Sequence, residues 1–346
     1  MCQRGFTLVE LMVTVIVIGI MSMVLAPAFG SFVSAQKLAY ADKHRMNNQL
    51  IGVALLKYAA NSTTTGRLPA AYTGGGYTKT VYNPSDGTAA GLALTQTLTQ
   101  SGINPGEIND DGTTVKKVRV YQLVQGLTQS VPLYFQSGPL ATLTFDFGAI
   151  YLTDCMLATA SCNPTAGTGV PGTSAAMTSG NYTTWAIAGT DGTAFFVSSL
   201  SIQKDMLATT VQRLDKIRDS LISYLRVQQV TAGGSDTTNW YPNQAGAAAA
   251  GTLTGGVPGT NQGCRDGWYD LSNAGVTVLP TIGLSASEFG TTAWGGAIQY
   301  CRDYDPTAAK AANAAPHYAA IRILASVSSG SAPDNAVVGN NIVLTL

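Results

Sequence analysis

The chain opens with an apolar run from Phe6 to Phe29 that contains one ionisable side chain, Glu10. A helix of about 20 apolar residues crosses the hydrocarbon core of a bilayer, so the run predicts a membrane-spanning helix over about residues 6–29. A carboxylate in such a helix is costly unless it is paired, and acids in these segments usually have a function. Glu10 is therefore the first candidate functional residue.

Two simpler interpretations of the run remain open. A cleaved secretory signal also begins with a short positive region, here Arg4, and then turns apolar. Against it, the apolar region of a signal spans only about 7 to 15 residues, and an acid such as Glu10 is out of place there. A plain membrane anchor is the second alternative.

The helical pattern continues past the apolar run to about residue 60. Met46, Leu50, Val53 and Leu56 recur at spacings of four, three and three, which places them on one face of an amphipathic helix. We expect this face to pack on a first sheet. Residues 60–66 are Asn, Ser, Thr, Gly and Ala, which favour a loop and predict the end of the helix.

Between residues 61 and 198 the pattern changes to strands and turns. β-Branched and aromatic residues gather in three runs, over residues 118–124, 132–135 and 140–147, and such runs predict strands. The Gly/Thr/Ala-rich stretch over residues 163–180 predicts an exposed loop.

A second amphipathic helix is predicted over residues 200–230. Its apolar residues recur at helical steps on one stripe, formed by Leu200, Leu207, Val211, Leu214, Ile217, Leu221 and Leu225. Charges of both signs lie largely off this stripe, as is typical of a solvated face. A further strand is predicted over residues 321–326.

Together these elements predict an α+β chain with two units behind the first helix. The 346 residues exceed the usual domain of about 100 to 200 residues. The tetrapeptides over residues 55–58 and 221–224 each precede a polar loop and a proline, which indicates either a divergent internal repeat or chance. We expect the units to span residues 61–198 and 199–346, each with a helix packed on an antiparallel sheet.

The first residues resemble the type IV pilin and pseudopilin family. The resemblance rests on a short basic leader ending at Gly5, on Phe-Thr-Leu-Val-Glu-Leu-Met-Val from Phe6, and on Gly19 and Pro27. It implies that a prepilin peptidase cleaves between Gly5 and Phe6 and methylates the new amino terminus of Phe6. It also implies that Glu10 neutralises the Phe6 amine of a neighbouring subunit during assembly, and a buried charge persists when it is paired in this way.

The same resemblance implies partners and a location. Residues 1–5 would be the leader and residues 6–60 the pilin helix, and the two units behind it would be pilin-like lobes. Expected partners are the prepilin peptidase, other pilin subunits and an inner-membrane assembly platform. Before assembly the chain would cross the bacterial inner membrane once, with its N-terminus in the cytoplasm. Afterwards it would lie in a pilus at the cell surface or in a periplasmic filament.

Charge excludes one broad class of function. Only 11% of the residues are charged and the formal net charge is zero. General nucleic-acid binding depends on neutralising several phosphates, and this composition disfavours it.

Cysteine usage agrees with an exported protein. Removal of the leader would remove Cys2 and leave Cys155, Cys162, Cys264 and Cys301, for which three connectivities are possible. We favour Cys155 with Cys162 and Cys264 with Cys301, because each pair then falls within one unit. A zinc site is the competing idea, but no Cys-x-x-Cys occurs and the two histidines are distant in sequence from all four cysteines.

Two segments near the end of the chain also resemble pseudopilins. Residues 294–300 are similar to a Trp-Gly-x-Pro-x-x-Tyr segment, without its proline, and residues 329–335 resemble a glycine-rich terminal loop in which some pseudopilins hold calcium. Calcium takes six to eight oxygen ligands, with carboxylates prominent. Only one of the side chains that this loop offers as oxygen ligands is acidic, Asp334. The others are the amides of Asn335, Asn340 and Asn341. A structural turn and a calcium site at Asp334 both remain possible, and no other cofactor is expected.

These observations favour a structural protein over an enzyme. The chain has no Gly-x-Ser-x-Gly, His-Glu-x-x-His or P-loop motif. The leading hypothesis is a minor-pilin-like subunit of a type IV pilus, and the first alternative is a pseudopilin of a type II secretion system. A pilus-tip adhesin that binds a glycan or surface is the second alternative. It predicts an exposed cluster of aromatic side chains rather than core packing, with these candidates: Trp185, Trp240, Tyr241, Trp268 and Tyr269.

Overall fold

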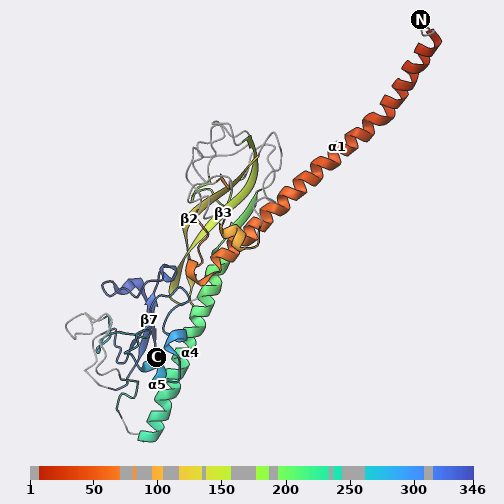
Figure 1. Cartoon of the computed structure of the whole chain (residues 1–346). Helices are drawn as coiled ribbons and strands as arrows, with labels where there is room; N and C mark the ends of the chain where they lie inside the picture. The colour runs from red at the N-terminus through yellow and green to blue at the C-terminus, as the bar shows by residue number, and fades with distance from the viewer. Residues whose placement is uncertain are drawn as a thin grey trace.

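The computed structural model describes residues 8–70, 81–82, 96–103, 117–134, 138–156, 177–186, 194–233, 237–243, 262–307 and 315–346. Two long helices and two antiparallel sheets make up most of this part of the chain (Figure 1). The first helix extends far beyond the rest of the molecule at its N-terminal end, and the second lies beside the C-terminal sheet. The predicted combination of helices with antiparallel sheets is confirmed.

Helix α1 runs from Leu8 to Ala59 and has 52 residues. It is followed by the short 3-10 helix η1 (Ser62–Thr64). There the hydroxyl of Thr64 donates to the carbonyls of Tyr58 and Ala59, two of the acceptors that a helix end leaves without an intrahelical partner. The predicted loop over residues 60–66 therefore ends the helix.

The predicted membrane span, residues 6–29, falls almost entirely on positions whose side chains the structure does not describe. Within the described part of the chain, no helix is long and apolar enough to cross a membrane. Gly5 and Phe6, on either side of the predicted cleavage position, also lie outside the described residues. The span and the cleavage therefore stay predictions.

The first sheet is antiparallel, with strand order β1-β2-β3-β4. Its strands are β1 (Val81–Tyr82), β2 (Lys117–Pro132), β3 (Leu140–Met156) and β4 (Phe195–Ser198). Strands β2 and β3 contain the predicted runs over residues 118–124 and 140–147 but are much longer. Of the strand predicted over residues 132–135, Pro132 is the last residue of β2, Leu133 and Tyr134 lie in a bend, and Phe135 lies outside the described residues.

The face of α1 that packs on this sheet also differs from the predicted one. Met46, Leu50 and Val53 are 61%, 52% and 57% exposed, whereas Leu56, the fourth residue of the predicted face, packs against the core of the first sheet. The residues buried instead are His44, Asn47, Asn48, Ile51, Ala54, Leu55 and Ala59. Gly52 explains the choice of face, because a Cβ at this position would collide with the Phe195 ring of β4. Apolar spacing detects a stripe but not which side of a helix meets its neighbour.

Each face of the first sheet carries its own buried cluster. On one face, α1 packs against Tyr121, Ile150 and Val197, and Leu68 and Leu98 belong to the same cluster. On the other face, segment 177–185 contributes Met177 and Trp185, which pack on the sheet residues Val124, Leu127, Phe145, Ala149 and Tyr151. The first sheet is therefore covered on both sides.

Helix α4 runs from Leu200 to Ala232, close to the predicted range. Four residues of the predicted stripe are buried, namely Leu207, Leu214, Ile217 and Leu221, and the other three are partly buried against the same core. The second sheet is antiparallel in the order β5-β6-β7-β8, with strands β5 (Tyr269–Asp270), β6 (Gln299–Cys301), β7 (Ala320–Leu324) and β8 (Asn341–Thr345). Shorter helices lie beside it: α5 (Val278–Thr281), α6 (Ala286–Phe289), η2 (Val327–Ser329) and η3 (Val338–Asn340).

The hairpin of β2 and β3 reaches from the first sheet to the second. Its residues Leu133, Ala141 and Leu143 belong to the same buried cluster as α4 and the second sheet. The amide of Thr142 donates to the Ala325 carbonyl at 2.8 Å, just after β7. This hydrophobic core therefore contains residues from both sides of the predicted boundary between units 61–198 and 199–346. The division into these units stays a prediction.

Candidate functional site

The exposed side of α1 carries an apolar stripe. Phe32, Met46, Leu50 and Val53 are separated by fourteen, four and three residues, which returns each to about the same face of a helix. All four are between 52% and 61% exposed. We call these four residues the α1 stripe. Large apolar side chains that form a contiguous exposed patch usually mark a contact with another molecule; Val33 and Tyr40 are also exposed, on other sides of the helix.

Glu10 belongs to the same continuous helix as the α1 stripe, since α1 begins at Leu8. Its side chain lies outside the described residues, as do Gly5 and Phe6. Nothing in the described residues tests the pairing predicted for Glu10.

Where the chain leaves α1, a buried carboxylate ties it to the first sheet. Asp146 of β3 is fully buried. Its Oδ2 accepts hydrogen bonds from Arg67 Nε at 2.9 Å and from the Leu68 amide at 3.0 Å, and its Oδ1 accepts from the Gly126 amide at 3.1 Å. The Arg67 guanidinium also forms an ion pair with it at 2.7 Å. The charge is thus paired and hydrogen-bonded, as a buried charge requires.

One side chain of α4 completes this junction. Gln203 is fully buried, and its Nε2 donates to the carbonyls of Thr65 and Gly66, both at 2.9 Å. Its Oε1 accepts from Trp294 Nε1 and from the Ser328 hydroxyl, both at 2.8 Å. Two donors and two acceptors use the full capacity of the amide. Gln203 therefore connects the end of α1, the start of α4 and two segments beside the second sheet.

Sequence reasoning did not find this junction. One signal was present, because Gln203 lies four residues before Leu207 on the apolar side of the predicted helix. A polar residue at a buried position must have hydrogen-bond partners. The sequence does not reveal those partners, since Thr65 and Trp294 are distant along the chain.

The predicted disulfide between Cys264 and Cys301 is present. It joins the segment before β5 to the end of β6, and Arg265 beside it forms ion pairs with Asp303 at 3.6 Å and Asp305 at 3.4 Å. For the other predicted pair, the side chain of Cys155 and the whole of Cys162 lie outside the described residues. That pairing stays a prediction.

The loop proposed for calcium is closed by protein donors. The Asp334 carboxylate accepts hydrogen bonds from Asn340 Nδ2 and from the amides of Ala336 and Val337. These bonds hold the pKa of Asp334 below its usual value. Asn341 Oδ1 accepts from the Asp334 amide. Calcium needs six to eight oxygen ligands, and the calcium site at Asp334 stays a prediction.

A buried arginine lies beside this loop. Arg322 of β7 is 1% exposed and donates to Gln299 Oε1, Gln262 Oε1 and Asn335 Oδ1. Its guanidinium lies 4.3 Å from the centre of a Trp268 ring, which is a cation–π contact. Burial lowers the pKa of Arg322 to about 10. This cation therefore holds three segments together at the position next to the terminal loop.

Most of the aromatic candidates for an adhesive platform lie in the core. Trp185, Tyr241, Trp268 and Tyr269 are at most 9% exposed, and Trp240 is half-buried. The core-packing interpretation is confirmed for the first four, so they offer no open platform for a sugar.

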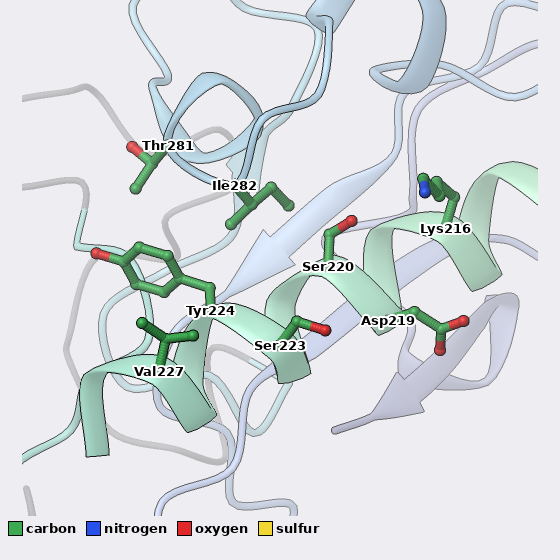
Figure 2. Close-up of a pocket in the computed structure, with 8 residues that line it drawn as sticks. All are labelled: Lys216, Asp219, Ser220, Ser223, Tyr224, Val227, Thr281 and Ile282. Atoms are coloured by element: carbon green, nitrogen blue, oxygen red, sulfur yellow. The ribbon is translucent and has the colours of Figure 1, made fainter. Parts of the chain in front are cut away.

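A shallow groove of about 360 Å³ lies between α4 and the end of α5 (Figure 2). Its lining residues are Lys216, Asp219, Ser220, Ser223, Tyr224, Val227, Thr281 and Ile282. Its ionisable lining residues are Lys216, Asp219 and Tyr224. Among the described residues, no group of three or more His, Cys, Asp or Glu side chains is placed to hold a metal ion.

The comparisons with known proteins concern the start of the chain. Residues 1–26 match the family model of the prokaryotic N-terminal methylation motif. The chain carries a class III prepilin signal of the type IV pilin and pseudopilin kind. The signal contains Gly5, Phe6 and Glu10, and it implies processing by a peptidase, insertion into a membrane before assembly, and assembly with other pilins. Neither the curated proteins nor the solved structures give a match to the chain.

Proposed function

We propose that the chain is a minor-pilin-like structural subunit of a type IV pilus. In this proposal the prepilin peptidase cleaves after Gly5 and methylates Phe6, and the assembly platform of the inner membrane then adds the subunit to a filament through α1. The observation that carries the proposal is the α1 stripe. The stripe lies on the same helix as the prepilin signal. The described residues of the chain leave it exposed.

The stripe is costly for a subunit that stays alone in water. Each exposed apolar side chain that becomes buried gains about 1.5 to 3 kcal/mol. A filament in which neighbouring α1 helices pack together buries the stripe, whereas the polar contacts of Asp146 and Gln203 keep each subunit's own fold in place. Assembly therefore uses the outer face of α1, and folding uses the inner face.

The experiment places a charge on the stripe. In cells that express the full chain, Val53→Glu should lower the amount recovered in sheared filaments at least about tenfold, because a charge buried in an interface costs several kcal/mol. The processed protein should accumulate in the membrane fraction instead.

The matched control is Val230→Glu on α4, which changes an 84% exposed valine in the same way but away from α1. It should leave incorporation unchanged, and both variants should keep the thermal midpoint because exposed substitutions usually change stability by less than about 0.5 kcal/mol. Normal incorporation of Val53→Glu contradicts the proposed assembly face. Recovery of the wild-type chain in periplasmic filaments, without surface fibres, indicates a pseudopilin of a type II secretion system instead.

Glu10 has a separate role in this proposal, since its carboxylate pairs with the Phe6 amine of a neighbouring subunit. Glu10→Ala should reduce incorporation into filaments while leader removal proceeds normally, and Glu10→Asp should restore part of it. Gel mobility reports cleavage and sheared-fibre yield reports incorporation. Normal fibre yield for Glu10→Ala would contradict the proposed pairing between Glu10 and the Phe6 amine.

A further inference from the structure

Strand β8 forms one edge of the second sheet and pairs with β7 on its other side. Two hydrogen bonds at its ends show which backbone groups face β7. The Leu346 amide donates to the Ala319 carbonyl at 2.8 Å, and the Ala325 amide donates to the Asn340 carbonyl at 2.7 Å. Hydrogen-bonded pairs alternate with non-hydrogen-bonded pairs along an antiparallel ladder. Backbone groups at the even-numbered positions of β8 therefore face β7, and those at the odd-numbered positions face away from the sheet.

The outward backbone groups of β8 belong to Asn341, Val343 and Thr345. The Asn341 amide is already used, since it donates to the Val338 carbonyl. Within the described part of the chain, no hydrogen bond reaches the N–H or C=O groups of Val343 and Thr345 from the outer side. Two donors and two acceptors therefore lie in a row along this edge. Such a row is a template on which another strand pairs.

The sequence of this edge does not discourage pairing. Natural sheet edges are usually protected, because they are short or carry charged residues or proline. The opposite edge of the same sheet, β5, follows this rule, since it has two residues and one of them is Asp270. Strand β8 has five residues without charge or proline, and it pairs with β7 in one continuous register. The β8 edge is thus open to an incoming strand.

The outward groups of β8 match a second copy of themselves. When two β8 strands run antiparallel, Val343 of one copy faces Thr345 of the other, and the symmetry repeats the match. Residues in a hydrogen-bonded pair exchange both of their N–H···O bonds, so every outward group of these two residues is used. Residues 335–346 contain no ionisable side chain, so no like side-chain charges meet across the contact. A patch that serves both copies in this way gives a closed twofold contact.

We propose that two copies of the chain pair through their β8 edges while both are held in the membrane, so that their second sheets join into one. Four hydrogen bonds give a weak contact between free molecules, because association costs translational and rotational freedom. Two copies anchored in one membrane meet at a raised effective concentration, which lowers this cost. The inference goes beyond the proposed function, and it uses the second sheet rather than the α1 stripe.

The experiment is disulfide cross-linking of the full chain in the membranes of cells that express it. In this pairing, position 344 of one copy lies opposite position 344 of the other. Their Cα atoms lie about 4.5 Å apart in a non-hydrogen-bonded pair, within the usual span of a disulfide. With copper phenanthroline as the oxidant, Leu344→Cys should give a dimer band on a non-reducing gel. The wild-type chain gives the background from its own cysteines.

Three variants serve as controls. Val338→Cys reports random collision, since Val338 is 54% exposed but does not meet its copy, and it should stay at background. In the Leu344→Cys chain, Thr345→Pro removes an outward N–H without touching the β7 ladder and should lower the dimer yield at least about tenfold. Thr345→Val keeps this N–H and should keep the yield.

A second measurement needs no new cysteine. Sedimentation of the wild-type chain in detergent should show a monomer–dimer equilibrium that Thr345→Pro shifts toward monomer. A wild-type chain that stays monomeric at every concentration, or a cross-link that is equally strong in Val338→Cys, overturns the pairing. A cross-link from Leu344→Cys to a different protein, in place of the dimer, assigns the edge to that protein and also overturns it.

The Val53→Glu change separates this inference from the proposed function. Combined with Leu344→Cys, it should leave the dimer band unchanged although filament incorporation falls. Loss of the dimer band with Val53→Glu would assign the association to α1 and overturn the role of β8. Normal incorporation of Val53→Glu together with an intact dimer band contradicts the proposed assembly face alone.

Discussion

At the scale of single residues, Arg322 shows how a buried cation organises the end of the chain. Its guanidinium reaches Gln299 on β6, Gln262 before β5 and Asn335 in the terminal loop, and it lies over Trp268. All three of these hydrogen-bond acceptors are neutral amides. Arginine suits this site because its planar fork presents several donors at fixed angles, which lysine does not reproduce.

A first prediction concerns calcium. Because Asp334 already accepts three hydrogen bonds, we expect the thermal midpoint of the folded chain to change by less than about 1 °C between excess calcium and excess EDTA, since only a ligand that binds the folded state stabilises it.

Arg322→Lys should lower the free energy of unfolding by about 2 kcal/mol.

Arg226→Lys is the matched control, since Arg226 is exposed on α4 and its replacement should have little effect. For the calcium prediction, a thermal midpoint of the wild-type chain that rises by several degrees with calcium would show that the folded chain binds the ion.

A second prediction concerns alkaline pH. Burial raises the pKa of Tyr121 and Tyr300 well above 10, and burial together with Asp215 raises the pKa of Tyr134 to about 12. Groups whose folded pKa is raised stabilise the fold fully below their unfolded pKa and lose this contribution as the pH rises through the folded pKa. The free energy of unfolding should therefore fall between about pH 10 and about pH 12, as measured by urea unfolding.

Arg322 works in the opposite direction, because its lowered pKa of about 10 favours the folded state as the pH rises beyond that value. One such group does not offset three tyrosines whose pKa values are raised. Tyr134→Phe should make the fall shallower, since it removes one raised pKa. An unfolding free energy that stays constant across this range would mean that these tyrosines are accessible to hydroxide in the folded chain.

At the scale of elements, the exposed faces of the two long helices differ in polarity. α1 exposes apolar residues and packs through a face that includes Asn47, Asn48 and Gly52. α4 exposes polar residues and packs through a leucine-rich stripe. The difference is what a filament subunit needs if α1 contacts other subunits and α4 contacts water.

A third prediction tests the junction between these helices. Gln203→Ala removes four hydrogen bonds and leaves Trp294 Nε1 without its acceptor, so it should lower the free energy of unfolding by about 2 to 3 kcal/mol. Lys204→Ala, one residue along and exposed, should change it by less than about 0.5 kcal/mol. Urea unfolding of both variants measures the difference. Equal stability of the two variants would show that the hydrogen bonds of Gln203 do not stabilise the junction.

At the scale of the whole molecule, the end of the β2–β3 hairpin of the first sheet joins the hydrophobic core of the second sheet. Leu133, Ala141 and Leu143 at the end of the β2–β3 hairpin lie in the cluster that also contains Ile321 and Ile323 of β7. A core that is continuous in this way couples the unfolding of the parts that it joins. Sequence reasoning expected two units, because it found two helices each followed by strands.

A fourth prediction follows from this continuity. Two single-tryptophan variants, one that keeps Trp185 beside the first sheet and one that keeps Trp268 beside the second, should show coincident urea transitions when fluorescence is followed. Coincident transitions are the test of a single cooperative unit. Two separate midpoints would support the division at residues 198 and 199.

The sequence by itself determined the elements whose signals are local. The prepilin signal follows from the resemblance of the first residues to a known family. The extent of α4, its buried stripe and the region where α1 ends follow from the spacing of apolar residues and from loop-forming composition. The pairing of Cys264 with Cys301 was also predicted, since both cysteines fall after α4.

Only the tertiary structure decided which surfaces meet. It selected the inner face of α1 through the close approach at Gly52, placed Asp146 and Gln203 at one junction, and carried the β2–β3 hairpin into the second core. These choices depend on contacts between residues that are far apart in the chain, such as Gln203 with Thr65 and Trp294. Periodicity within one segment has no information about them, because it records which residues avoid water and not which partner covers them.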